Sequence, residues 1–219
     1  MRYDPDVDLE PIAHLVDAPQ ALFVGAEHPA QNIEEYLDSI TDNADEASVG
    51  IVTLGSPTHF SLVALAESTG VPIVPVPYSG VAPMLTDIIS GVLPAGINPI
   101  GGQIEQKRSG KIRFLAITGE QRSALLPDLP TMSEAGFDEF SMASGWFAAY
   151  APKDTPAELI AELEENLLLA MQDEKIIERL NTLALEPTGL TAEELRERVQ
   201  NERAYWAPII EPSGFTHGD

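Results

Sequence analysis

Residues 53–60, TLGSPTHF, combine residue types that can bind an anion where a strand turns into a helix. An apolar run precedes this stretch, and a helix-like run follows it. Ser56 is a favourable helix N-cap, and Pro57 is a favoured first helical residue. The backbone amides of Thr58 and His59 would then be unpaired at the positive end of a helix dipole, where carboxylates and phosphates bind. The same pattern is typical of an ordinary capped turn, so both interpretations stay open.

Two further stretches repeat this arrangement. YSGVAP (78–83) ends a predicted strand at Tyr78 and opens a helix near Pro83, and TGEQRS (118–123) follows the run IRFLAIT. In an open α/β sheet such turns gather at the carboxyl ends of the strands, where ligands bind. Two capped helix starts that converge there would suit a small dicarboxylate.

The elements that must position these turns alternate along the chain. Apolar runs predict strands at 21–25, 49–54, 71–78, 112–118 and 145–152. Amphipathic runs predict helices near 32–41, 58–69, 82–90, 101–109 and 131–135. The alternation favours βαβ units and a mainly parallel sheet.

Helix starts carry recognisable caps. Four pairs have the spacing of a capping box: Asn32 with Glu35, Thr131 with Glu134, Thr155 with Glu158, and Thr191 with Glu194. Beyond about residue 150 the pattern changes to two amphipathic helices, 155–173 and 191–210, and no strand is expected between them. In the first of these helices Ile160, Leu163, Leu167 and Leu168 share one face and are expected to pack in a core.

Composition excludes several functions. The 219 residues include 12 basic and 35 acidic side chains, a net charge of −23, which repels nucleic acid and anionic lipid. This acidity favours a surface suited to high salt, as in halophilic proteins, over a specific basic partner. With no cysteine and four scattered histidines, neither a metal site nor a cofactor is expected.

Sequence motifs for catalysis are also missing. The chain has no GxGxxG fingerprint, no P-loop and no GxSxG elbow, so an enzyme is not expected. His59 is interpreted as a helix-start residue rather than a general base. No apolar run has the roughly 18 to 20 residues of a membrane span, and the acidic start MRYDPDVDLE does not resemble a signal peptide.

Several stretches together resemble the substrate-binding proteins of tripartite tricarboxylate transporters, the Bug family. They are YDPDVDLEPIAHL, the GSPT turn, VPYSGVAPMLTDIISG, GKIRFLAITGEQRSALLPDLPTMSEAGF, SGWFAAYAPKDTP and EPTGLTAEELRERVQNERAYWAPII. The resemblance covers nearly the whole chain. It implies a type II periplasmic-binding-protein-like α/β fold, in which two domains enclose a small anionic solute.

The resemblance also implies departures from the family. Members carry roughly 80 to 90 further residues before YDP, so we expect one complete α/β domain at 18–143, and part of a second at 1–17 and 144–219 with a helical C-terminal tail. Pro57 stands where the family usually has glycine, which removes a backbone donor. Ser61 stands where histidine is usual, and Pro94 and Asn98 replace positions that are commonly aspartate.

The resulting hypothesis is a solute-binding protein that captures a di- or tricarboxylate or an acidic amino acid for tripartite tricarboxylate uptake, with membrane permease subunits as partners. The alternatives are a shortened family member that keeps the fold without binding, and a metabolite-sensing or interaction module. By resemblance the protein would be periplasmic or extracellular, whereas the missing signal peptide leaves a cytoplasmic location open. The expected ligand-binding residues are Gly55, Ser56, Thr58, His59, Tyr78, Ser79, Gly80, Ala82, Asn98 and Thr118.

Overall fold

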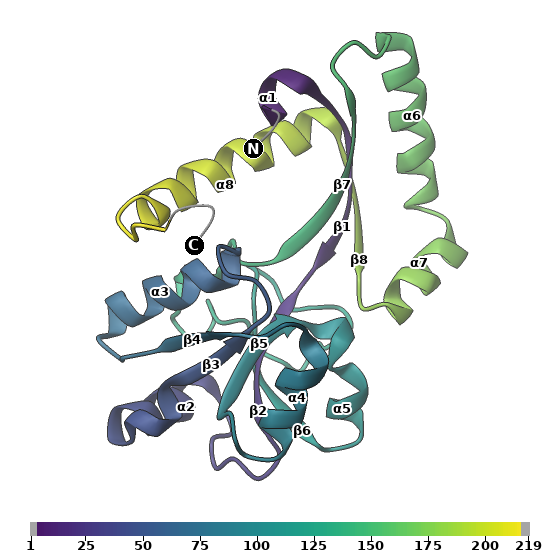
Figure 1. Ribbon diagram of the computed structural model, residues 1–219. Coiled ribbons are helices and arrows are strands. Elements are labelled where there is room, and N and C mark those ends of the chain that lie inside the picture. Colours follow the sequence, from purple (N-terminus) through teal and green to yellow (C-terminus); the bar gives the residue numbers. More distant parts are fainter. Residues whose placement is uncertain (1–3, 216–219) are drawn as a thin grey trace. The chain divides into compact units, whose positions relative to one another are not determined.

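The computed structural model describes residues 4–215 (Figure 1). The chain forms two compact units: unit 1 comprises Met1–Ala18 and Trp146–Ala204, and unit 2 comprises Pro19–Gly145 and Tyr205–Asp219. The sequence placed 144–219 wholly in the partial domain, whereas residues after 204 group with unit 2. The reason is that Trp206 and its apolar neighbours pack against the core of unit 2.

Unit 1 is built on a three-stranded sheet in the order β7-β1-β8. Its strands are β1 (Leu9–Ala18), β7 (Gly145–Pro152) and β8 (Glu186–Thr191), and β8 is antiparallel to β1. Its helices are α1 (Pro5–Asp8), α6 (Ala157–Ala170), α7 (Glu174–Thr182) and most of α8 (Ala192–Ile210). The expectation of no strand between the last two helical segments is wrong, because β8 lies there. Every residue of β8 is half-buried, so the strand shows no apolar alternation.

Helix α6 covers one face of this sheet. Ile160, Leu167 and Leu168 pack against the cluster that contains Ile12 and Ala13. Leu163 was expected on the same buried stripe, but its side chain is 37% exposed. Unit 1 therefore covers only part of the apolar face of α6.

Unit 2 is built on a five-stranded mixed sheet in the order β4-β3-β5-β2-β6. Its strands are β2 (Gln20–Gly25), β3 (Ser48–Ile51), β4 (Val74–Pro77), β5 (Ala95–Pro99) and β6 (Ile112–Ile117). β3 pairs in parallel with β4 and β5, whereas β2 is antiparallel to both β5 and β6. The expected mainly parallel sheet is thus only partly correct, because β2 is inserted antiparallel between two strands that run the other way.

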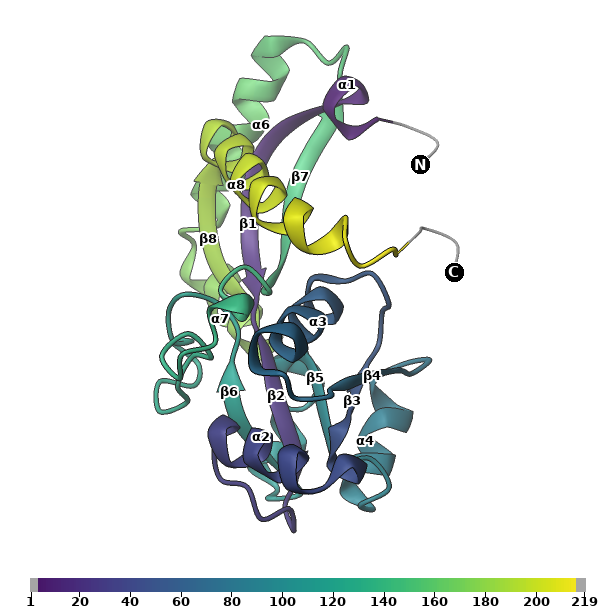
Figure 2. The same cartoon turned by 90° about the vertical axis from the view of Figure 1, so that its left-hand side faces the viewer.

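Helices cover both faces of this sheet (Figures 1 and 2). They are α2 (Ile33–Asp42), α3 (Pro57–Thr69), α4 (Val81–Ile89) and α5 (Ile104–Arg108), with the short 3₁₀ helices η1 (Ala44–Ala47), η2 (Ile100–Gly102) and η3 (Asp138–Phe140). α2 and α3 enclose the main core on one face. On the other face α4 lies so close that a Cβ at Gly50 or Gly96 would come within 2.8 Å of its side chains or of Leu93.

Most local expectations for unit 2 are confirmed, but the sequence did not predict β5, and one expected helix is missing. The helix expected at 131–135 is wrong, although the Thr131 and Glu134 capping bonds do form, from Thr131 N–H to Glu134 Oε2 and from Glu134 N–H to Thr131 Oγ1. The chain continues in turns because Ala135 and Gly136 donate to residues only three positions back, and Gly136 has a positive φ. In unit 1 the expected Thr155 cap is also wrong, since α6 starts after Pro156 without a side-chain cap.

Candidate functional site

The carboxyl ends of β3, β4, β5 and β6 meet at one edge of the unit 2 sheet. The register places Ile51 opposite Pro77, Gln20 opposite Pro99, and Ala21 opposite Ile117. The last residues of these strands, the loops that leave them and the first turns of α3 and α4 carry all ten residues that the sequence predicts for ligand binding. The topology therefore gathers the predicted residues at a single edge, which we call the carboxyl edge.

The turn between β3 and α3 is capped as predicted. Ser56 is the N-cap of α3, and its Oγ accepts the His59 N–H at 3.3 Å. Thr58 is buried, and its Oγ1 lies 2.9 Å from Ser56 Oγ. Because Pro57 has no N–H, Thr58 is the one first-turn residue whose amide has no acceptor among the described residues.

Two backbone donors at this turn are already used. The His59 amide is held by the Ser56 cap, so the expectation that it is unpaired is wrong. The Gly55 N–H donates to His59 Nδ1 at 3.2 Å. Burial lowers the pKa of His59, so its ring is neutral near pH 7 and accepts this hydrogen bond. His59 therefore braces the turn.

Gly55 holds the turn in a left-handed conformation. Its φ is +75°, a region that residues with a side chain rarely adopt. A Cβ at this position would also lie 2.6 Å from the Phe215 ring. Glycine is thus required here both by the backbone conformation and by Phe215, which packs beside it.

The start of α4 is the second candidate cradle. Gly80 is its N-cap in an extended conformation and supplies no side-chain cap, so the amides of Val81 and Ala82 have no acceptor in the part of the chain that the structure describes. No heavy atom lies within 4 Å of the position that a Gly80 Cβ would occupy. Ser79 and Ala82 are exposed beside this space. The α4 start can therefore accept an anion at its positive end.

Tyr78 positions α4 rather than offering a free hydroxyl. Its N–H donates to Ile51 O at 2.8 Å, and its hydroxyl donates to Asp87 Oδ2 at 2.8 Å. Burial, followed by the hydrogen bond and charge of Asp87, raises the pKa of Tyr78. The phenol thus joins the end of β4 to the second turn of α4.

Asn98 lies near the end of β5 and is 5% exposed. Its Nδ2 is buried and finds no acceptor within residues 4–215. Side chains two positions apart share a face of a strand, so Asn98 lies on the same face as Gly96, which is the face that α4 covers. This side chain is an unsatisfied donor beside the α4 start.

Thr118 is occupied by structural contacts. Its N–H donates to Gln20 O at 2.8 Å, and its Oγ1 accepts the Gln20 N–H at 3.0 Å. The same hydroxyl lies 3.0 Å from Ser144 Oγ. Thr118 therefore joins β6 to the start of β2 at the carboxyl edge.

The sequence did not single out Gln103. This residue is fully buried at the start of α5, and both of its side-chain polar atoms have no partner among the described residues. The preceding Gly102 would place a Cβ 3.3 Å from Val81 Cγ1, so the α5 start adjoins the α4 start. The only sequence signal was a glutamine in the otherwise apolar and glycine-rich run IGGQI.

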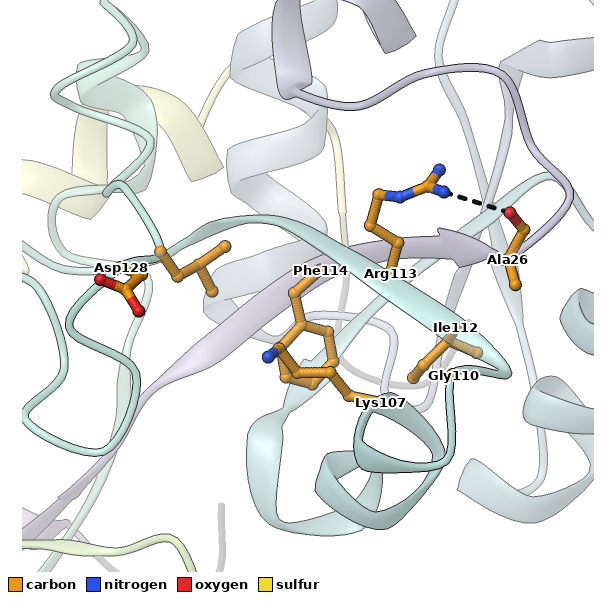
Figure 3. Close-up of a pocket in the computed structure, with 8 residues that line it drawn as sticks. Ala26, Lys107, Gly110, Ile112, Arg113, Phe114 and Asp128 are labelled. Atoms are coloured by element: carbon orange, nitrogen blue, oxygen red, sulfur yellow. Dashed lines mark hydrogen bonds between the residues drawn. The ribbon is translucent and has the colours of Figure 1, made fainter.

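A separate cavity of about 410 Å³ lies along β6 (Figure 3). Lys107 lies over the Phe114 ring at 6.0 Å, while Arg113 donates to the backbone oxygen of Ala26 at 3.2 Å. Asp128 lines the same cavity, so it contains both signs of charge. None of the ten predicted residues is among those that line it.

Comparison with known proteins identifies the family. The model of the tripartite tricarboxylate transporter family receptor, TctC, matches residues 1–215. The chain belongs to this receptor family. BugT from Bordetella pertussis is 30% identical over 207 residues, which cover 94% of this chain and 63% of BugT. The TctC chain thus spans less than two thirds of the length of this curated relative.

Solved structures agree with this assignment. The Rhodopseudomonas palustris protein Rpa4515, solved with adipate, is 30% identical in sequence and superposes with a TM-score of 0.84. The alignment covers 98% of this chain and 71% of the Rpa4515 chain. The R. palustris protein MatC, solved with bound malate, is 27% identical with a TM-score of 0.77. The alignment covers 95% of this chain and 72% of the MatC chain. The periplasmic binding protein BugD is 30% identical with a TM-score of 0.79, and the alignment covers 97% of this chain and 71% of the BugD chain. The predicted type II periplasmic-binding-protein-like α/β fold is confirmed.

The family is one of solute-binding receptors and not of enzymes, and its structural relatives include periplasmic binding proteins. Within the described part of the chain, no helix combines the length and apolar character needed to cross a bilayer.

Proposed function

We propose that this TctC chain binds a small carboxylate at the carboxyl edge of unit 2. The observation that carries the proposal is the pair of helix starts at one sheet edge, where the amides of Thr58, Val81 and Ala82 have no acceptor within residues 4–215. Free amides at a helix start, added to the helix dipole, bind carboxylates without a cationic side chain. The net charge of −23 makes such local donors necessary, because the wider field repels anions.

The ligands of two relatives support this class. Rpa4515 was solved with adipate and MatC with malate, and both are dicarboxylates. We extend this chemistry to the present chain as the expected ligand class. Uptake through membrane permease subunits of a tripartite transporter, and a location outside the cytoplasmic membrane, are the corresponding proposals for its physiological role.

The test is calorimetric titration of the purified chain with succinate, malate, adipate and citrate. Val81→Pro removes one free amide of α4 and suits the extended Gly80 before it. One lost hydrogen bond to a charged group should weaken binding by roughly tenfold. Ala157→Pro makes the same change at the first residue of α6 in unit 1 and should leave affinity unchanged.

The main alternative is a chain that keeps the family fold without binding. Folded protein that gives no heat with any of the four acids would establish this alternative. Equal weakening by the two proline variants would instead place binding away from the α4 start.

A further inference from the structure

Asn98 offers a donor that no group in the described chain accepts. Its Nδ2 is buried without a partner, and only 5% of the residue is exposed. A buried donor without an acceptor destabilises the folded chain, so we expect either an ordered water or a ligand group to pair with it in the functional state. Rotation of the side-chain amide exchanges Nδ2 with Oδ1, so the donor can face either side.

The face of Asn98 places this donor at the start of α4. The Cβ of Gly96, two residues earlier on the same face, would lie 2.8 Å from Ile88 Cδ1 and 3.3 Å from Met84 Sδ. After β5 the chain reaches Gly102, where a Cβ would lie 3.3 Å from Val81 Cγ1. The strand end therefore runs along α4 toward its first residue, where two amides are free.

The region around Asn98 and the start of α4 combines a neutral side chain with the positive end of a helix dipole. Asn98 carries no charge, and the α4 start contributes the partial positive charge of its dipole and its free amides. None of the ten candidate residues is an acid that could neutralise a cation on the ligand. An ammonium group could donate to Asn98 Oδ1 but would face a helix start that repels it, whereas a carboxylate oxygen would accept from both Asn98 Nδ2 and the α4 amides.

We propose that Asn98 is a specificity-determining residue that selects dicarboxylates without an amino group over acidic amino acids. This inference rests on the proposed carboxylate-binding function and narrows its ligand class. The amide pairs with a ligand carboxylate oxygen beside the α4 start. The absence of a carboxylate at position 98 leaves a ligand ammonium without a counter-charge.

The replacement Asn98→Asp tests this role because aspartate has nearly the same shape as asparagine but adds a negative charge. A carboxylate at this position would repel the ligand carboxylate, offset the α4 dipole and attract an ammonium group. The probes are two matched pairs, succinate with aspartate and glutarate with glutamate, which differ only in the α-amino group. Calorimetric titration gives the affinity ratio within each pair.

The unsubstituted chain should bind succinate or glutarate at least tenfold more tightly than its amino counterpart, and Asn98→Asp should reduce that ratio at least tenfold. Asn201→Asp adds the same charge at an exposed site on α8 and should leave the ratio unchanged. Asn98→Thr keeps a neutral donor and should keep the preference even where affinity falls. Circular dichroism checks that each variant is folded.

The outcomes separate the two proposals. If the unsubstituted chain binds aspartate or glutamate as tightly as the amine-free acid, the inference about Asn98 is wrong and the proposed function stands. The same conclusion follows if folded Asn98→Asp keeps the original ratio. If none of these four acids binds, and malate, adipate and citrate do not bind either, the proposed function itself fails.

Discussion

Replacement of Pro57 tests whether the α3 start contacts the ligand. Pro57 is the first residue of α3 and lacks an N–H, so this helix offers one donor fewer than its geometry allows. Pro57→Ala and Pro57→Gly both restore the amide, while alanine keeps the chain stiffer than glycine does. A common effect of both variants on binding would therefore come from the added N–H.

The magnitude follows from the position of the residue. Pro57 is half-buried next to the buried Thr58, so an added N–H would be partly shielded from water. A hydrogen bond to a charged group contributes about 1.5 to 3 kcal/mol, which corresponds to a gain in carboxylate affinity of roughly tenfold or more. Loss of the proline releases the unfolded chain and should cost about 0.4 to 1 kcal/mol of stability.

The assay pairs calorimetric titration with thermal unfolding of the unliganded chain. We expect tighter binding together with a melting temperature lower by roughly 1 to 4 °C for a chain of this size. Pro156→Gly, before α6 in unit 1, is the matched control: it should lower stability without changing affinity. Unchanged affinity in both Pro57 variants would refute a role for the α3 start and leave α4 as the remaining cradle.

Two further predictions concern stability. Thr118→Val removes the hydroxyl that accepts the Gln20 N–H, and the buried donor left behind should cost about 1 to 3 kcal/mol in urea unfolding; an unchanged midpoint would contradict this structural role. Burial, followed by the charge of Arg198, lowers the pKa of His14 to about 4. The unfolded histidine titrates near 6.5, so it binds more protons than the folded one between pH 6.5 and 4, and stability should fall as the pH decreases through this window. The advantage of the unsubstituted chain over His14→Gln should shrink correspondingly, whereas a constant difference would show that His14 does not titrate there.

Local signals predicted the β3–α3 turn well. Ser56 is followed by a proline and a helical run, and the cap it forms depends only on residues within three positions. The same is true of Asn32, whose side chain accepts the Glu35 N–H at 2.8 Å. Such caps depend only on neighbouring residues, so they can be predicted without knowledge of the fold.

Features that depend on distant residues were not predictable. β8 is recognisable only through its pairing with β1, and its own residues show no alternation. Gln103 looked like one more polar residue until the fold buried it completely. Thr118 looked like a ligand residue because its turn resembles the others, but its hydroxyl is taken by a residue 98 positions away.

The His59 side chain illustrates an intermediate case. Its position beside a helix start was read correctly, but its bond from the Gly55 amide depends on a ring orientation that the sequence does not specify. Contacts with Phe60 and Phe215, at 5.1 and 5.8 Å between ring centroids, help to hold that orientation. The sequence around Ser56 thus predicted that His59 lies at a helix start. Tertiary packing of the His59 ring determines that the Gly55 N–H is used and is not free.

The return of the C-terminal residues to unit 2 has a consequence for the order of synthesis. The core of unit 2 is completed by four residues near the carboxyl end: Trp206, Ile209, Ile210 and Phe215. The first member of this core, Leu22, is synthesised more than 180 residues before them. During translation this core stays open along one side until nearly the whole chain has emerged. Unit 2 therefore cannot reach its final packing in the amino-to-carboxyl order that serves many domains during synthesis. A truncation that removes Trp206 and the residues after it would take away part of the interior of unit 2 and not merely a terminal segment.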